Sequence, residues 1–347
     1  MRNRALEPSG PAKMRALAAA LPSGLRDGFR SGVAIAPGAS ARTTTVFCVG
    51  MGGSGIASEL ARGLVAAETA LSLEVVRSPD LPRAVGRHSL VVLVSYSGTT
   101  WETLRAYDAA GRAGARRVVV TSGGTLAERA ERDGVPFLPL PPGIPPRTAV
   151  GTMFGGLLGL IDPLFPESNE RRLENAASRV EAAVPEFGRA RGLPARLARR
   201  LGDRLPIVYA ESAFAGLARR WATQIEENAK CLAFFDEVPE LFHNALVGWD
   251  AVRPTEARRC AVVLIEWSEE SAPTRKSFDY LDRLLARRGV RVLRVPLESE
   301  DRLEALLVGL ALGDHLSLFL AEARHVDPYP VEAITRLKAA LADPARR

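Results

Sequence analysis

The feature that most constrains the fold is a glycine-rich turn, GMGGSG at Gly50–Gly55, between an apolar run and a segment with helical periodicity. The run before the turn, Thr43–Val49, has the composition of a buried strand, and the residues after it, IASELARGLVAA, repeat apolar positions along one helical face. A strand, a tight turn and a helix in direct succession form one unit of a parallel α/β sheet.

The pattern recurs in both halves of the chain. In the first half, strand-like runs occur at Leu73–Val76, His88–Val94, Arg116–Thr121 and Val135–Leu140, with helix-like segments at 101–113 and 126–133. In the second half, they occur at Arg204–Ala210, Cys231–Phe235, Ala261–Trp267 and Val290–Val295, with helix-like segments at 213–229, 274–288 and 301–323. Strands that alternate with helices predict parallel sheets covered on both faces. We expect an α/β protein with two similar, doubly wound units in tandem.

The length of 347 residues also favours two domains. A proline-rich segment at 139–151 and Arg-rich helical residues at 168–202 separate the two runs of strands. We expect an N-terminal helical arm at 1–40, a first domain at 41–165, a second domain with leading linker helices at 166–325, and a C-terminal tail at 326–347.

Composition and spacing argue against several classes of partner. The net charge of +6 comes from scattered arginines without a consecutive basic block, so no nucleic-acid partner is expected. The longest uncharged apolar run, Ala149–Ile161, is shorter than the roughly 18 residues of a membrane span, so we expect a buried helix and no membrane partner. Three distant cysteines in apolar runs and the lack of a cleavage-site pattern near Pro22 favour free thiols in the cytoplasm. No Cys/His spacing indicates a metal site.

Two turns carry groups that suit a phosphate. A glycine-rich turn at a helix start exposes backbone N–H groups at the positive end of the helix dipole. The turn SYSGTT at Ser95–Thr100 adds hydroxyl groups before another helix. Two such turns at the carboxyl ends of strands in one sheet face each other across the usual ligand crevice. The candidate phosphate ligands are Gly53 and Ser54 in the first turn and Ser95, Ser97 and Thr100 in the second.

A dinucleotide site is one alternative for the first turn, because Gly50, Gly52 and Gly55 match the GxGxxG spacing. The acidic residue that would bind the ribose is not evident, since Asp80 lies too far beyond the second strand. A turn without a ligand, and a Ser/Thr cluster that only caps its helix, are the simpler alternatives.

A candidate acid–base pair lies in the segment TQIEENAKCLAFFDEVPELFHN. Glu227 precedes the expected buried strand at Cys231–Phe235, and His243 follows it. A helix, a strand and a loop in this order can bring both side chains to one end of a sheet, where they can move two different protons on one substrate. Each residue also has a simpler interpretation, as a solvated carboxylate at a helix end and as a structural histidine.

These motifs together resemble the bifunctional phosphoglucose/phosphomannose isomerases, which are built from two sugar isomerase (SIS) domains. The resemblance rests on GMGGSG, SYSGTT, ENAK at Glu227–Lys230, PELFHN at Pro239–Asn244 and PVEAITRLK in the tail, and it extends from about Val46 to Lys338. It implies two tandem SIS domains and reversible isomerisation of glucose 6-phosphate and/or mannose 6-phosphate with fructose 6-phosphate, without a cofactor. The alternative is a non-catalytic SIS protein that binds a sugar phosphate for regulation.

The resemblance implies a role for each candidate residue. Glu227 would move a proton between C1 and C2, and His243 would help to open the ring. Arg147, in PPRTAVG, would stabilise the enediolate, and Lys338 would serve the ring oxygen or a hydroxyl. The reaction itself requires a base next to a carbonyl and a fixed cation for the developing negative charge. Arg147 as a loop residue and Lys338 as a surface lysine remain the simpler alternatives.

The chain departs from the family pattern at Trp101, Phe242, Ala245 and Tyr329, which leaves the preferred sugar and the efficiency open. None of these positions removes a proposed catalytic group. Trp101 changes the charge expected beside the phosphate turn.

The resemblance also implies a symmetric homodimer, in which His243 enters the site of the neighbouring subunit. The segment Pro239–Trp249 is rich in apolar side chains, and a two-fold interface is the commonest cover for such a surface. The alternative is that the segment folds back onto its own domain.

Overall fold

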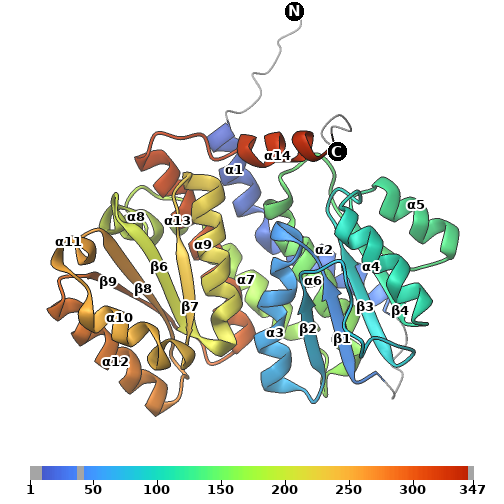
Figure 1. Cartoon of the computed structure of the whole chain (residues 1–347), viewed down its shortest axis with the longest axis horizontal. Helices are drawn as coiled ribbons and strands as arrows, with labels where there is room; N and C mark the ends of the chain where they lie inside the picture. The colour runs from blue at the N-terminus through green and yellow to red at the C-terminus, as the bar shows by residue number, and fades with distance from the viewer. Residues whose placement is uncertain (1–9, 37–42, 343–347) are drawn as a thin grey trace, which may run out of the picture.

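The structure, a computed structural model, describes residues 10–36 and 43–342. Two parallel sheets lie side by side, and helices flank each of them (Figure 1). The expected α/β class with two helix-covered sheets is therefore confirmed. The parts of the expected arm and tail at residues 1–9, 37–40 and 343–347 lie outside the described residues.

The first sheet has the strand order β2-β1-β3-β4-β5, and all neighbouring strands are parallel. Its strands are β1 (Thr45–Val49), β2 (Ser72–Val76), β3 (Ser89–Val94), β4 (Arg116–Thr121) and β5 (Phe137–Pro139), joined by α3 (Ile56–Glu68), α4 (Trp101–Arg112) and α5 (Gly124–Asp133). The strand order reverses beside β1, because β2 lies on one side of it and β3 on the other. The turns after β1 and β3 are therefore neighbours at the carboxyl edge of this sheet.

Alternation along the strands explains why both faces of this sheet are covered. Val46 and Cys48 of β1 pack in the cluster that contains α3, whereas Phe47 and Val49 pack in the cluster that contains α4 and α5. Successive side chains of a strand point to opposite faces, so a fully apolar strand needs a helical layer on each side.

The second sheet has the order β7-β6-β8-β9, again with all neighbouring strands parallel. Its strands are β6 (Leu205–Glu211), β7 (Phe234–Val238), β8 (Cys260–Trp267) and β9 (Arg291–Leu297). The accompanying helices are α9 (Ala215–Ala229), α10 (Ala245–Ala251), α11 (Pro254–Ala257), α12 (Ala272–Arg287) and α13 (Arg302–Ala323), with short 3-10 turns η4 (Ser212–Phe214) and η5 (Glu240–His243). One face of the sheet packs on α9 and α13, and the other packs on α12.

The prediction of a buried strand at Cys231–Phe235 is wrong in position and in burial. The strand β7 starts three residues later, at Phe234, and Leu232, Phe234 and Phe235 are 68%, 52% and 39% exposed. Because β7 is an edge strand with β6 as its neighbour, an aromatic-rich run here does not require a covered surface.

The second N-terminal helix packs onto the helix that was expected to be buried. This helix, α6 (Val150–Ile161), follows η2 (Pro146–Ala149) and is buried along almost its whole length. A Cβ at Gly155 would lie 2.2 Å from the carbonyl oxygen of Leu25, so the glycine allows α2 (Leu21–Ala34) to approach α6 closely. Helices α1 (Gly10–Ala19), α7 (Glu170–Phe187) and α8 (Leu193–Leu201) and the turn η3 (Asp162–Leu164) complete this region.

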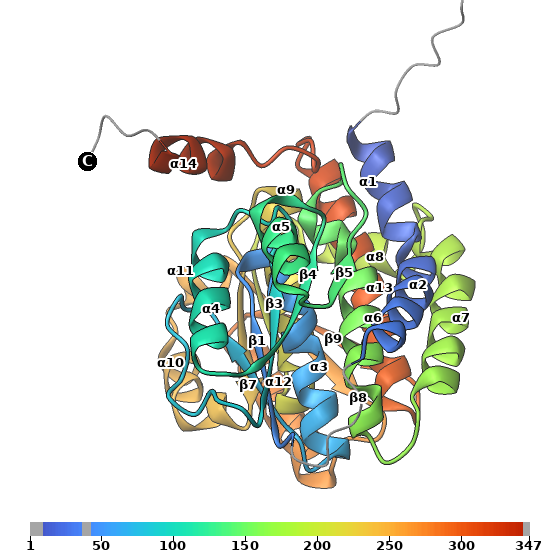
Figure 2. The ribbon, with the colours of Figure 1, turned by 90° about the vertical axis from the view of Figure 1, so that its right-hand side faces the viewer.

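Within the described residues, α13 is the one helix long and apolar enough to cross a membrane by length and composition. However, 89% of its most apolar window is buried inside the protein, which is the environment of a core helix. The last helix, α14 (Glu332–Ala342), extends beyond the body of the molecule (Figure 2).

Candidate active site

The first candidate phosphate turn lies between β1 and α3 and contacts two other parts of the site. Ser54 in η1 (Gly52–Ser54) is 8% exposed, and its Oγ accepts a hydrogen bond of 3.2 Å from the backbone N–H of Tyr96. This bond joins the first turn to the second. A Cβ at Gly53 would lie 3.3 Å from the backbone nitrogen of Arg147. The first turn therefore abuts both the second turn and the segment that carries Arg147.

The second turn holds its hydroxyl groups in two pairs. Ser95 Oγ donates to Thr100 Oγ1 at 2.9 Å, and Ser97 Oγ accepts from the hydroxyl of Thr99 at 3.0 Å. Ser95 is buried whereas Ser97 is exposed, so the pairs lie at different depths. Gly98 has a φ of +65°, and a Cβ there would lie 1.7 Å from a carbonyl oxygen of the next loop, so this turn requires glycine.

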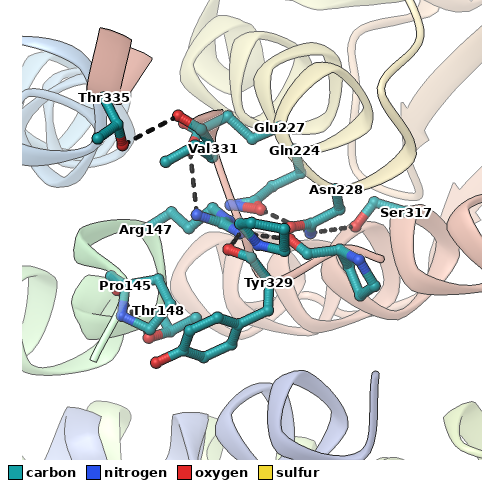
Figure 3. A network of polar contacts seen from close by, with 12 residues as sticks. Pro145, Arg147, Thr148, Gln224, Glu227, Asn228, Ser317, Tyr329, Val331 and Thr335 are labelled. Atoms are coloured by element: carbon teal, nitrogen blue, oxygen red, sulfur yellow. Dashed lines mark hydrogen bonds and ion pairs between the residues drawn. The ribbon is translucent and has the colours of Figure 1, made fainter. Parts of the chain in front are cut away.

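Arg147 is the centre of a polar network that joins three parts of the chain (Figure 3). Its side chain is 1% exposed. Nε donates to Asn228 Oδ1 at 2.8 Å and one terminal nitrogen donates to Glu227 Oε2 at 3.2 Å. The other terminal nitrogen donates to the carbonyl oxygens of Pro328 and Tyr329 at 2.6 and 3.1 Å. Burial lowers the pKa of the guanidinium, and the charge of Glu227 opposes this effect.

The segment ENAK forms the last turn of α9 and holds the tail. The carboxylate of Glu227 is 26% exposed and faces Arg147. Lys230 ends the helix in a left-handed conformation, with a φ of 52°. Its Nζ donates to the carbonyl oxygens of Glu227 and Pro330 at 2.5 and 2.7 Å. Burial, and next the charge of Arg147, lower the pKa of this amine. Lys230 thereby ties the end of α9 to the start of the tail.

A groove of about 590 Å³ opens beside Arg147. One wall is the loop that precedes α6, and the other is the tail with the first turn of α14. The lining residues are Gly143, Ile144, Pro145, Pro146, Arg147, Tyr329, Pro330, Val331, Glu332, Thr335 and Arg336. This volume is in the range of small-molecule sites, so the buried cation borders a space large enough for a sugar phosphate.

The structure does not bring Glu227 and His243 of one chain together. Glu227 lies at the end of α9, before β7, and His243 follows the strand in η5, so the two residues lie beyond opposite ends of β7. A strand of five residues spans roughly 16 Å at about 3.3 Å per residue. The expectation that helix, strand and loop would place both side chains at one end of a sheet is therefore wrong within a single chain.

Lys338 lies outside the polar network. It is exposed on α14, and it makes no hydrogen bond or ion pair with the residues that the structure describes. It follows Thr335, which lines the groove, by three positions, so both lie on the same side of the helix. That Lys338 contacts the reacting groups remains a prediction.

The apolar segment Pro239–Trp249 largely folds back onto its own half of the molecule. Leu241 and Trp249 are buried in the core that includes α12, and Phe242 and Leu246 pack against the same core. Val247 is 72% exposed. The chain itself covers most of this segment. The apolar character of the segment therefore gives little support to a dimer.

The four departures from the family pattern occupy different environments. Trp101 is 58% exposed at the first position of α4, beside the second phosphate turn. Phe242 and Ala245 pack against the core beneath α12. Tyr329 is half-buried, and Lys13 Nζ lies 4.9 Å from the centre of its ring.

Sequence reasoning missed the residues that hold Arg147. Asn228 is 2% exposed and binds Arg147 directly, and Arg220 donates to the backbone carbonyl of Arg147 at 2.9 Å. In the sequence, only the position of Asn228 in ENAK, next to Glu227, could have indicated that it belongs to the site. His315, in contrast, is a core residue, since it is 2% exposed and its Nδ1 lies 2.9 Å from the carbonyl oxygen of Ala311.

Comparisons with known proteins agree with this architecture. Residues 192–341 match the family model described as the bacterial phospho-glucose isomerase C-terminal SIS domain. The crystal structure of a hypothetical protein from Thermus thermophilus has a TM-score of 0.73 at 16% identity, with 98% of this chain and 92% of that chain covered. At this identity the likeness concerns the fold.

Two relatives have a higher sequence identity. The bifunctional phosphoglucose/phosphomannose isomerase of Caldicellulosiruptor bescii is 34% identical over 307 residues, which cover 86% of this chain and 89% of the relative. The protein of the same name from Aquifex aeolicus is 34% identical over 295 residues, with 84% and 88% covered. The chain belongs to the family of the bifunctional phosphoglucose/phosphomannose isomerases.

Proposed function

We propose that this protein is an isomerase that interconverts fructose 6-phosphate with glucose 6-phosphate and/or mannose 6-phosphate through an enediolate. The observation that carries the proposal is the contact between the phosphate turns and the Arg147–Glu227 pair. Gly53 abuts the segment of Arg147, and Arg147 contacts Glu227. A phosphate bound at the turns can therefore direct the sugar carbons toward a carboxylate and a buried cation. The names of the relatives support the same activity.

In the proposed reaction, Glu227 removes the proton from C2 of the open-chain aldose. The electrons of that bond form the C1–C2 double bond of the enediolate, and its negative oxygen is stabilised by Arg147. Transfer of the C2 hydroxyl proton to O1 moves the negative charge to O2, and return of the first proton to C1, as the C2–O double bond forms, gives the ketose. His243 and Lys338 would move protons between the anomeric hydroxyl and the ring oxygen during ring opening. The phosphate would be bound by Gly53, Ser54, Ser95, Ser97 and Thr100.

The finer features of the proposal are a homodimer, a cytoplasmic location and a role in glycolysis and gluconeogenesis. Support for the dimer comes from β7, because His243 can meet a Glu227 only if another copy supplies one of them. We propose the domain division at 41–165 and 166–325, with the tail from residue 326 as a part of the active site. The two groups of strands and the tail contacts of Arg147 support this division.

The proposed function is tested by adding fructose 6-phosphate to the purified protein and measuring both aldose products with coupled dehydrogenases. We expect glucose 6-phosphate and/or mannose 6-phosphate to form, and the rate to be unchanged by a chelator. No aldose product, together with fructose 6-phosphate binding in calorimetry, would support the regulatory alternative. Loss of all activity on chelation would contradict the proposal that no metal is needed.

Ser54→Ala and Ser97→Ala are each expected to lower kcat/KM by about 10- to 100-fold, since a hydrogen bond to a charged group contributes roughly 1.5–3 kcal/mol. Both kcat and KM should change, because remote phosphate binding orients the reacting carbons. Steady-state kinetics with fructose 6-phosphate measures the effect. The matched control is Ser277→Ala, whose exposed hydroxyl donates to a carbonyl oxygen of its own helix. Equal turnover of unphosphorylated fructose would contradict the assignment of the phosphate site.

A further inference from the structure

The residues that bind the guanidinium of Arg147 lie far from it in the sequence, beyond the first sheet and its helices. Its partners belong to α9 and to the tail, whereas Arg147 itself lies in η2, before α6. A guanidinium has five N–H groups, and four of them have partners here. The fifth is on the nitrogen that also contacts Glu227. We propose that Asn228 is a positioning residue for isomerisation, which fixes this guanidinium so that the remaining N–H can serve the substrate. This inference rests on the proposed function.

The orientation of the Asn228 amide follows from its neighbours. Arg147 Nε can only donate, so the amide oxygen of Asn228 must face it, at 2.8 Å. The amide nitrogen then points to Ser317 Oγ at 2.9 Å (Figure 3). Ser317 Oγ donates its own proton to the carbonyl oxygen of Asp314 at 2.7 Å, so it is free to accept from Asn228. Arg147 therefore donates to Asn228, Asn228 donates to Ser317, and Ser317 donates to Asp314.

A second contact fixes the backbone of Arg147. Arg220 is 2% exposed, forms two hydrogen bonds of 2.9 Å with Asp314, and donates to the carbonyl oxygen of Arg147. Asp314 and Ser317 both lie in α13, and Arg220 and Asn228 both lie in α9. The same two helices thus hold both the main chain and the side chain of Arg147.

The groove of about 590 Å³ borders Arg147, so its guanidinium has space to turn away from Asn228 if that contact is lost. On the far side of Asn228, a cavity of about 10 Å³ borders Arg220, Asn228 and Asp314, which is at the lower limit for one water molecule. Without Asn228, the Nε–H would lose its acceptor, and the guanidinium would turn toward other partners. Because Asn228 acts through Arg147 and away from the phosphate turns, its loss should affect kcat more than KM.

The test compares Asn228→Leu, Asn228→Asp and Ser317→Ala with wild type in steady-state kinetics on fructose 6-phosphate. Asn228→Leu is expected to lower kcat on the order of 100-fold, which is the effect of a small misplacement of a catalytic group. KM should change far less than kcat. Asn228→Asp keeps an oxygen that accepts from Nε, so it should retain more activity than the leucine variant. Ser317→Ala should show a smaller decrease in kcat. The control is Asn175→Leu, which removes an exposed amide from α7.

Three results would overturn the inference. These are an unchanged kcat in Asn228→Leu, a loss confined to KM, or no advantage of aspartate over leucine at temperatures where all variants are folded. A crystal structure of Asn228→Leu supplies a readout that does not depend on activity. A displaced guanidinium is expected, and an unmoved one would refute the positioning role. If the wild type itself lacks isomerase activity, the proposed function fails, and this structural comparison still decides whether Asn228 holds Arg147.

Discussion

Glu227→Gln is expected to lower kcat for fructose 6-phosphate by about 10²- to 10⁴-fold, which is the usual contribution of a general base. The amide has nearly the same shape as the carboxylate but cannot accept the proton from carbon. Its side-chain oxygen can still accept from Arg147, so the polar network should persist and KM should change little. Steady-state kinetics in both directions measures this effect, because the same group serves the forward and the reverse proton transfer.

The matched control for this variant is Glu226→Gln, the adjacent residue on the same helix turn. Glu226 is exposed, and partial desolvation of its carboxyl raises its pKa, but no hydrogen bond joins it to Arg147 among the described residues. We expect this variant to keep its turnover within about twofold, as is usual for a surface substitution. If Glu227→Gln turned over as fast as wild type, Glu227 would not be the base.

Mixing two inactive variants, Glu227→Gln and His243→Ala, is expected to restore about a quarter of wild-type activity. In a two-fold dimer, each site would take Glu227 from one chain and His243 from the other. A mixed dimer then carries both lesions in one site and leaves the second site intact. Random reassortment makes about half of the dimers mixed, and half of their sites are functional. The measurement is the isomerase rate after the two variants are unfolded and refolded together.

Each variant refolded alone is the control for this experiment, and wild type treated in the same way gives the recovery of folding. A mixture that stays inactive while wild type recovers would contradict shared sites. A mass near 37.3 kDa in light scattering would exclude the dimer directly. The position of β7 between Glu227 and His243 makes the restoration a sharp test, because a monomer cannot bring its own two residues together without a large rearrangement.

The parts of the fold that were predicted from the sequence are those with local signals. Val46–Val49 and Leu90–Val94 are continuous apolar runs, and glycine-rich or hydroxyl-rich turns follow them, so both strands and the turns after them were predicted correctly. The strand β7 was misplaced by three residues because an edge strand need not be buried. Its aromatic residues gave the pattern of a core strand without its environment.

The site was harder to predict because its geometry depends on contacts distant in sequence. Arg147 lies 81 positions from Asn228 and 181 from Pro328, and two of its acceptors are backbone carbonyls, which every residue possesses. No residue type in the tail therefore indicates that it binds a guanidinium. The separation of Glu227 from His243 follows from the direction of β7, which the order of elements alone does not specify.

The contacts of Arg147 also determine when a newly synthesised chain can complete its candidate site. Domains generally fold from the N terminus during translation, so the first sheet with its two phosphate turns can form early. The acceptors for the guanidinium at Pro328 and Tyr329 leave the ribosome only after both sheets have been made. A chain that stops in translation before the tail therefore has the turns after β1 and β3 but lacks two of the acceptors that hold the guanidinium of Arg147.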